Sequence, residues 1–108
     1  MYVRMTIKRV KPEHREVYLR TWEEQARAAQ TNEPGAPGYF FMQDNNDKNS
    51  FIFVAIFKDR AAQQAHLQTP HLKKCKEILR GNGIEAEDLG GWEATNIVPD
   101  DQALGQRN

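Results

Sequence analysis

The sequence contains few of the residues that crosslink a chain, anchor it in a membrane or bind a cofactor. One cysteine among 108 residues cannot form an internal disulfide, which excludes the disulfide-rich secreted class. No apolar run approaches the roughly 20 residues that span a bilayer, and the N-terminal residues lack the apolar stretch of a signal peptide. The 15 basic residues balance the 15 acidic ones, so we expect no general affinity for nucleic acid or anionic lipid. These absences predict a soluble cytoplasmic domain without a nucleic-acid or membrane partner.

Motifs for the common cofactors are missing as well. Gly35, Gly38, Gly81 and Gly83 do not form the G-x-G-x-x-G fingerprint of a dinucleotide site, and no Walker A sequence occurs. One cysteine and three scattered histidines give no zinc-binding spacing. The only serine, Ser50, lies in a polar loop and not in a nucleophile elbow. An enzyme with this sequence would work through acid–base groups in a shaped pocket, and we expect no metal or cofactor.

The first half of the chain predicts a strand, a long helix and a hairpin. Apolar and polar residues alternate over 2–10, which predicts a half-buried strand with Val3, Met5 and Ile7 on one face. Helical spacing over about 12–31 predicts a helix that is buried mainly through Tyr18 and Trp22. Strands beginning at Tyr39–Met42 and covering Phe51–Phe57 are then expected to form a hairpin joined by a longer polar loop.

The second half predicts two helices and a last strand. Asp59 is a suitable N-cap for a short helix over about 60–67. Thr69 and Pro70 begin a second helix, which Gly81 and Gly83 end. One stripe of that helix carries His71, Leu72, Cys75, Ile78 and Leu79. After an acidic connector over 84–90, a final strand is predicted from Trp92 to Val98.

The length fits one domain, which we assign to residues 1–98, followed by a polar tail over 99–108. The order strand, helix, strand, strand, helix, strand is that of the ferredoxin-like split βαβ fold. This is an α+β fold with an antiparallel sheet and helices on one face.

The apolar run Phe51–Phe57 leaves one sheet face without a cover. A helix-backed sheet should alternate apolar and polar residues, whereas both faces of this run are apolar. One face packs on the helices, and the other would expose a patch typical of an interface. We expect a homodimer whose sheets pack face to face into a barrel-like sandwich. The alternatives are a helix that curls over both faces or coverage by the tail 99–108, which is too polar for that role.

Two histidines bracket the joint between the later helices. His71 falls near a helix start, where the positive end of the helix disfavours imidazolium. A neutral imidazole beside an aromatic pocket is a competent general base, which makes His71 the catalytic candidate. The alternative is a buried histidine with structural hydrogen bonds, and for His66 a hydrogen bond at the helix joint is the expected role.

Aromatic residues supply candidate walls for a pocket between the sheet and the helices. Plain core packing is the alternative for each of them. Arg4 and Thr6 lie on the second face of the first strand, where they would orient a substrate oxygen if that face looks into a dimer interior, and would be solvated otherwise. The candidate wall residues are Tyr2, Tyr39, Phe41, Phe53, Phe57 and Trp92.

Two segments resemble the antibiotic biosynthesis monooxygenase family, with similarity over about residues 2–98. The first is Glu33-Pro34-Gly35-x-x-Gly38-Tyr39, and the second runs from Ala65 to Lys73, where the His66–His71 segment resembles the quinol monooxygenase branch. The resemblance implies a ferredoxin-like homodimer with a β-barrel centre and a pocket between each sheet and its helices. It also implies oxidation of a quinol or hydroxylated aromatic by O₂ without metal or flavin. His71 corresponds to the histidine most often implicated in this fold.

Departures from the family pattern keep other functions open. Ala55 stands where many members carry Glu, and Phe57 stands where Trp is frequent. Met5, His66 and Lys76 align with the Asn, Trp and His of the haem-degrading branch, so haem degradation is not implied. One alternative is an isomerase of a small oxygenated or phosphorylated metabolite that uses His71, with Arg4 or Lys73 as the cationic anchor. Another is a non-catalytic dimeric module that binds a small aromatic ligand.

Overall fold

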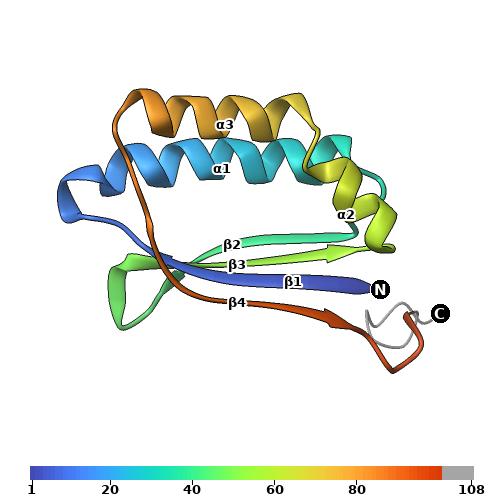
Figure 1. Cartoon of the computed structure of the whole chain (residues 1–108). Helices are drawn as coiled ribbons and strands as arrows, with labels where there is room; N and C mark the ends of the chain where they lie inside the picture. The colour runs from blue at the N-terminus through green and yellow to red at the C-terminus, as the bar shows by residue number, and fades with distance from the viewer. Residues whose placement is uncertain (101–108) are drawn as a thin grey trace.

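The structure is a computed structural model that describes residues 1–100, and it forms two layers (Figure 1). Four antiparallel strands lie in the order β2-β3-β1-β4. Helices α1 and α3 lie side by side over one face of this sheet, with α2 at one end (Figure 1). The α+β fold with helices on one face is therefore confirmed. The elements are β1 (Tyr2–Arg9), the 3₁₀ turn η1 (Pro12–His14), α1 (Arg15–Asn32), β2 (Gly38–Asp44), β3 (Asp47–Phe57), α2 (Arg60–His66), α3 (Pro70–Gly81) and β4 (Glu87–Thr95).

Two strand boundaries differ from the sequence prediction. The predicted longer loop between β2 and β3 is a tight turn, because the carboxylate of Asp44 accepts a hydrogen bond from the backbone N–H of Asn46. Strand β4 begins at Glu87, inside the predicted connector, and ends at Thr95. Its first residues pair with the end of β1, where Arg9 Nη1 lies 3.8 Å from a carboxylate oxygen of Glu87. Long-range pairing thus overrides the polar composition of this segment.

The face of β1 that looks toward the helices is the opposite of the one expected from the sequence. Phe53 packs against Trp22 of α1, with ring centroids 4.8 Å apart, so its face of β3 looks toward the helices. Thr6 is the register partner of Phe53, and Arg4 is the partner of Ala55, so both share that face. Val3, Met5 and Ile7 lie on the face that no described helix covers. The expectation that Arg4 and Thr6 face away from the helices is wrong.

The uncovered face is apolar across all four strands. Register partners place residues of β2, β3 and β4 beside the apolar residues of β1. Large side chains remain open to solvent there, with exposed fractions of 49% for Phe40 and 52% for Trp92. The members of this face are Val3, Met5, Ile7, Phe40, Met42, Ile52, Val54, Ile56, Trp92 and Ala94. A flat apolar patch of this kind is typical of an interface.

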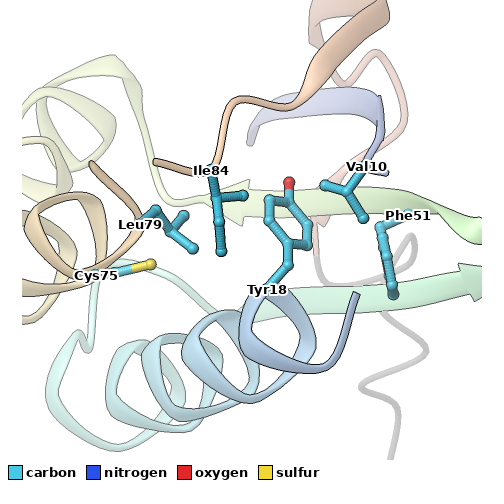
Figure 2. Packing of buried hydrophobic residues seen from close by; sticks show 6 residues of the cluster. All are labelled: Val10, Tyr18, Phe51, Cys75, Leu79 and Ile84. Carbon is cyan, nitrogen blue, oxygen red and sulfur yellow. The ribbon is translucent and has the colours of Figure 1, made fainter. Parts of the chain in front are cut away.

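The core lies where α1 and α3 meet the sheet. Figure 2 shows the Tyr18 side chain of α1 between the side chains that come from α3 and those that come from the sheet side. The rings of Tyr18 and Phe51 pack at a tilt of 42°, with centroids 5.4 Å apart, and Phe51 is fully buried. Cys75 and Leu79 of α3 complete this cluster together with Val10. The predicted apolar stripe of α3 is therefore its core-facing side.

Side chains at the N-cap positions make local hydrogen bonds at the starts of α2 and α3. The Asp59 side chain accepts a hydrogen bond from the backbone N–H of Ala62 at 2.8 Å, which confirms the predicted N-cap of α2. Thr69 occupies the N-cap position of α3, but its hydroxyl donates back to the carbonyl of His66 at 2.8 Å. This bond ties the end of α2 to the start of α3.

No helix within residues 1–100 combines the length and the apolar character that crossing a bilayer requires. The predicted polar tail over 99–108 falls mostly outside the described residues, which end at Asp100.

Candidate functional site

Three side chains from separate parts of the chain converge at one end of the helix layer. Glu33 reaches Nδ1 of His66 at 2.8 Å with one carboxylate oxygen and Nε2 of His71 at 2.5 Å with the other. The side chains are 10%, 7% and 18% exposed, respectively. A carboxylate only accepts hydrogen bonds, so both facing nitrogens act as donors. We call these residues the His–Glu–His cluster.

The local backbone explains how Glu33 reaches both histidines. Glu33 ends α1, and its own carbonyl accepts a hydrogen bond from the N–H of Ala36, so the chain turns back sharply. Gly35 then lies against α2, where an added Cβ would stand 2.9 Å from the Cβ of Ala62. The glycine carbonyl also accepts a 2.7 Å bond from the N–H of Lys58. The tight Pro-Gly turn therefore brings the end of α1 to the joint of α2 and α3.

His66 is held in a fixed orientation and borders a cavity. Its ring lies 5.3 Å from the ring centroids of both Tyr39 and Phe57. Because Nδ1 donates to Glu33, a neutral His66 carries its free lone pair on Nε2. Among the described residues, Nε2 has no hydrogen-bond partner, and His66 lines the cavity. This nitrogen can accept a proton from a molecule bound there.

The cavity has a volume of about 420 Å³ and lies between the sheet and the helices. Such a volume falls in the usual range for small-molecule sites, and the mixture of apolar walls with a few polar groups is typical of them. Aromatic and aliphatic walls come from α1, β3 and α3, including Trp22, Phe53 and Leu72. Polar groups come from β1, α2 and α3.

The predicted site residues divide into two groups. Arg4, Tyr39, Phe53, Phe57 and His66 line the cavity together. Of the other residues named from the sequence, those that do not line it are Tyr2, Phe41, His71, Lys73 and Trp92.

Phe41 packs in the core against Phe51 and Phe53, and Trp92 lies on the apolar open face of the sheet. His71 lies behind Glu33, beside a smaller cavity of about 90 Å³ between α1 and α3. His71 was predicted to be a base that touches the substrate, but it does not line the larger cavity. Any effect of His71 on a molecule bound there passes through Glu33.

Sequence reasoning missed Glu33 as a site residue. It was noted only as part of the Glu-Pro-Gly turn, 33 positions before His66. Two sequence features together could have pointed to Glu33. One is an acidic residue at a helix end, next to a Pro-Gly turn, and the other is the pair of histidines at the joint of two other helices. Their meeting depends on tertiary packing.

Burial alters the ionisation of two tyrosines that line the cavity. Burial raises the pKa of Tyr39 to about 12, although Nε2 of Gln25 donates a 3.0 Å hydrogen bond to its hydroxyl oxygen. Burial also raises the pKa of Tyr18 well above its ordinary value. Both phenols therefore stay neutral near pH 7, where they serve as hydrogen-bonding groups and not as bases.

The His–Glu–His cluster has the donor atoms of a metal site, and these atoms lie within 4.8 Å of one another. Two ligand atoms on a tetrahedral zinc ion, each at ~2.1 Å, would lie ~3.4 Å apart. The observed 2.8 Å and 2.5 Å contacts of Glu33 are shorter and match hydrogen bonds. The cluster therefore fits a network that shares protons better than it fits a metal centre.

Comparisons with known proteins agree with the fold. A family model described as antibiotic biosynthesis monooxygenase matches residues 1–78. An uncharacterized protein of Synechocystis is 35% identical over 72 residues, which cover 64% of this chain and 46% of that protein. The chain thus matches about half the length of this curated relative.

Solved structures extend the likeness over most of the chain. A candidate antibiotic biosynthesis monooxygenase from Bacteroides thetaiotaomicron is 28% identical, with a TM-score of 0.73 over 92% of this chain and 91% of that one. A second candidate, from Nitrosomonas europaea, is 20% identical, with a TM-score of 0.79 over 90% and 99% of the two chains. At that identity the second likeness concerns the fold alone.

Proposed function

The chain belongs to the antibiotic biosynthesis monooxygenase family, and from that premise we propose that it is a cofactor-independent monooxygenase of a quinol or another hydroxylated aromatic. The observation that carries the proposal is the cavity bordered by His66, whose free Nε2 is oriented by Glu33. Aromatic walls suit a flat ring, and a fixed imidazole suits removal of a phenolic proton. The cavity volume of about 420 Å³ suits a substrate of one to three rings.

The electrons that reduce O₂ come from the substrate itself. His66 accepts the phenolic proton at Nε2, and the phenolate passes one electron to O₂. The resulting superoxide and substrate radical combine to form a C–O bond. The imidazolium of His66 returns its proton to the peroxide. The O–O bond and the C–H bond of the same ring carbon then break, so that one oxygen atom stays on that carbon as a carbonyl and the other leaves as water. The protein contributes the base, the apolar walls and the exclusion of solvent.

Glu33 and His71 act as positioning residues in this proposal. Glu33 fixes the tautomer of His66 and stabilises the imidazolium that forms when Nε2 takes the proton. His71 donates to the second oxygen of Glu33 and thereby fixes the carboxylate. This assignment gives His71 an indirect role, in place of the direct role that sequence reasoning expected.

We also propose that a second copy of the chain covers the open face of the sheet. The support is the continuous apolar surface over four strands, on which Phe40, Met42 and Trp92 are 41–52% exposed. Face-to-face packing of two such sheets would bury these side chains, in the manner of aligned sheet sandwiches.

The test is oxygen uptake with a panel of reduced quinols and dihydroxyaromatics. His66→Gln should abolish uptake above the non-enzymatic background, whereas Glu33→Gln and His71→Gln should lower it by about 10²-fold and about tenfold, respectively. His14→Gln, at a half-buried histidine of η1 that does not line the cavity, is the matched control and should leave the rate unchanged. Circular dichroism would establish that each variant is folded.

Each other outcome has a definite meaning. Loss of uptake in His71→Gln equal to that in His66→Gln would restore His71 as the base. Uptake that a chelator abolishes would contradict the cofactor-independent reaction. No uptake across the panel by the folded wild-type protein would reject the monooxygenase proposal for these substrates.

A further inference from the structure

The cavity is lined by positively charged side chains, and a neutral quinol as substrate would not explain them. Three cationic side chains border it, namely Arg4 and Lys8 of β1 and Lys76 of α3. None of the described residues that line it is Asp or Glu. A neutral aromatic substrate would need apolar walls and a base, but it would not need three cations.

The orientation of β1 makes this lining unusual. In a helix-backed sheet, the strand face toward the helices is normally the apolar one. Strand β1 instead turns Arg4, Thr6 and Lys8 toward the helices and leaves its apolar residues on the open face. Charged side chains are costly to desolvate without a partner, so this orientation is stable only where the space beside them is wet or filled by a polar ligand.

The cations are only partly neutralised by the protein. Arg4 lies 2.8 Å from Glu93, and Lys8 lies 3.7 Å from Asp88, and both carboxylates stand on the edge strand β4, more than half exposed. Lys76 forms no ion pair with the acidic side chains of residues 1–100. Lys8 and Lys76 come from opposite layers, the sheet and the helices, and border the same cavity.

Lys8 and the base lie toward different ends of β1, and Arg4 lies between them. His66 contacts Phe57, whose register partner is Tyr2 at the start of β1. Lys8 pairs with Phe51 near the other end of the strand, six residues away, or about 20 Å of extended chain. A ligand that spans part of this length would place its hydroxyl near His66 and a second group near Lys8 and Lys76.

We propose that the substrate is a hydroxylated aromatic acid, whose anionic group is remote from the reacting ring and is bound by Lys8 and Lys76. This inference rests on the proposed function, because it names the substrate class of the same cavity. A carboxylate and a phosphate share the chemistry that these lysines recognise. The ligand's charge fixes its direction in the cavity and places the hydroxyl, not the acid, beside His66.

Equilibrium binding tests the proposal without any turnover. The probes are 6-hydroxy-2-naphthoate, its neutral methyl ester, 2-naphthyl phosphate and inorganic phosphate alone, measured by isothermal titration calorimetry. The acid should bind about tenfold more tightly than the ester at low ionic strength, and the ratio should fall as salt rises from about 20 mM to about 500 mM. Tighter binding of the naphthyl phosphate than of the naphthoate would identify phosphate as the preferred anion.

Lys8→Met and Lys76→Met should each lower the preference for the acid over the ester by about threefold or more. Lys73→Met, at an exposed lysine on the same helix that does not line the cavity, is the matched control for Lys76 and should leave the preference intact. Ala55→Glu places a carboxylate beside Arg4 on the cavity side of the sheet and should reverse the preference toward the ester.

Equal affinity for acid and ester in the wild-type protein would overturn the proposal. It would also be overturned if Lys73→Met and Lys76→Met had the same effect, because the attraction would then be a general surface field. A charge preference without any oxygen uptake would reject the monooxygenase reaction and keep the anion site. Oxygen uptake without a charge preference would reject the anion site and keep the monooxygenase reaction.

Discussion

On the side of the sheet that faces the helices, β1 presents Arg4, Thr6 and Lys8, whereas on the other side it presents Val3, Met5 and Ile7. The helix side combines a close-packed core around Phe51 with a cavity that contains cations and His66. The open side is apolar over its central strand positions, and Arg9, two residues after Ile7, continues the same alternation at its edge. Polarity therefore does not identify the inside of this molecule, because cationic side chains line the cavity between its layers and apolar side chains are exposed on the open face.

The largest expected difference between the two faces concerns phenylalanine. Phe51→Ala removes a fully buried ring and should lower the free energy of unfolding by about 3–5 kcal/mol. Phe40→Ala removes a ring that is 49% exposed on the open face and should cost less than half as much in the isolated subunit. Urea denaturation of both variants measures the contrast, and equal losses would mean that the open face is a second core.

A charge on the open face should alter assembly while leaving the cavity intact. Met5 lies at the centre of that face, between its register partners Val54 and Trp92. Met5→Lys should halve the mass observed by sedimentation velocity at micromolar concentration, because an unpaired charge would be buried in the proposed interface. Glu77→Lys, at an exposed position of α3, is the control. A wild-type chain that already sediments as a monomer would reject the dimer.

Two glycines, one in the turn beside α2 and one on the open face, have the same nearest approach for an added Cβ but different neighbours. A Cβ on Gly35 would stand 2.9 Å from the Cβ of Ala62, and a Cβ on Gly38 would stand 2.9 Å from Cδ1 of Ile56. Ile56 lies on the open face and can rotate its terminal methyl away, whereas Ala62 cannot move without its backbone. Gly35→Ala should therefore cost about 1–3 kcal/mol and weaken the His–Glu–His cluster, and Gly38→Ala less than about 1 kcal/mol. Thermal denaturation would distinguish them, and equal melting points would contradict this reasoning.

An alkaline loss of stability reports on the helix side alone. Burial raises the pKa of Cys75 from about 9 to about 12 and that of Tyr39 from about 10 to about 12. The unfolded chain loses these protons at lower pH than the folded chain. The stabilisation is therefore complete below about pH 9 and is lost as pH rises toward 12.

Urea denaturation between about pH 8 and about pH 11 measures this slope. Tyr39→Phe should make the slope shallower, because it removes one of the two groups whose pKa burial raises. An unchanged slope in Tyr39→Phe would mean that the phenol ionises alike in the folded and unfolded chains.

The fold could be predicted from the sequence because its signals are local. Alternation and apolar runs marked the strands, and Asp59, Pro70 and the glycines marked helix ends, so the element order followed. The apolar character of both faces of Phe51–Phe57 also predicted an uncovered sheet face. The orientation of β1 could not be predicted, because alternation separates two faces without saying which one the helices cover.

The site was less predictable than the fold. The His–Glu–His cluster joins positions 33, 66 and 71 through the meeting of three helix ends, which no spacing encodes. Trp92 was expected in the cavity and lies on the opposite face, since its place follows from the register with Met5. His66 and His71 were identified as a pair, but only packing decides which of them reaches the cavity.

One carboxylate ties together the end of α1, the end of α2 and the start of α3. This arrangement determines where the chain can be cut and rejoined. New termini or an inserted domain at the α2–α3 joint would separate the two histidines from Glu33, although the joint is short and lies near the surface. The turn at Asn45 and Asn46, which is exposed and lies far from these residues, is the better site for circular permutation.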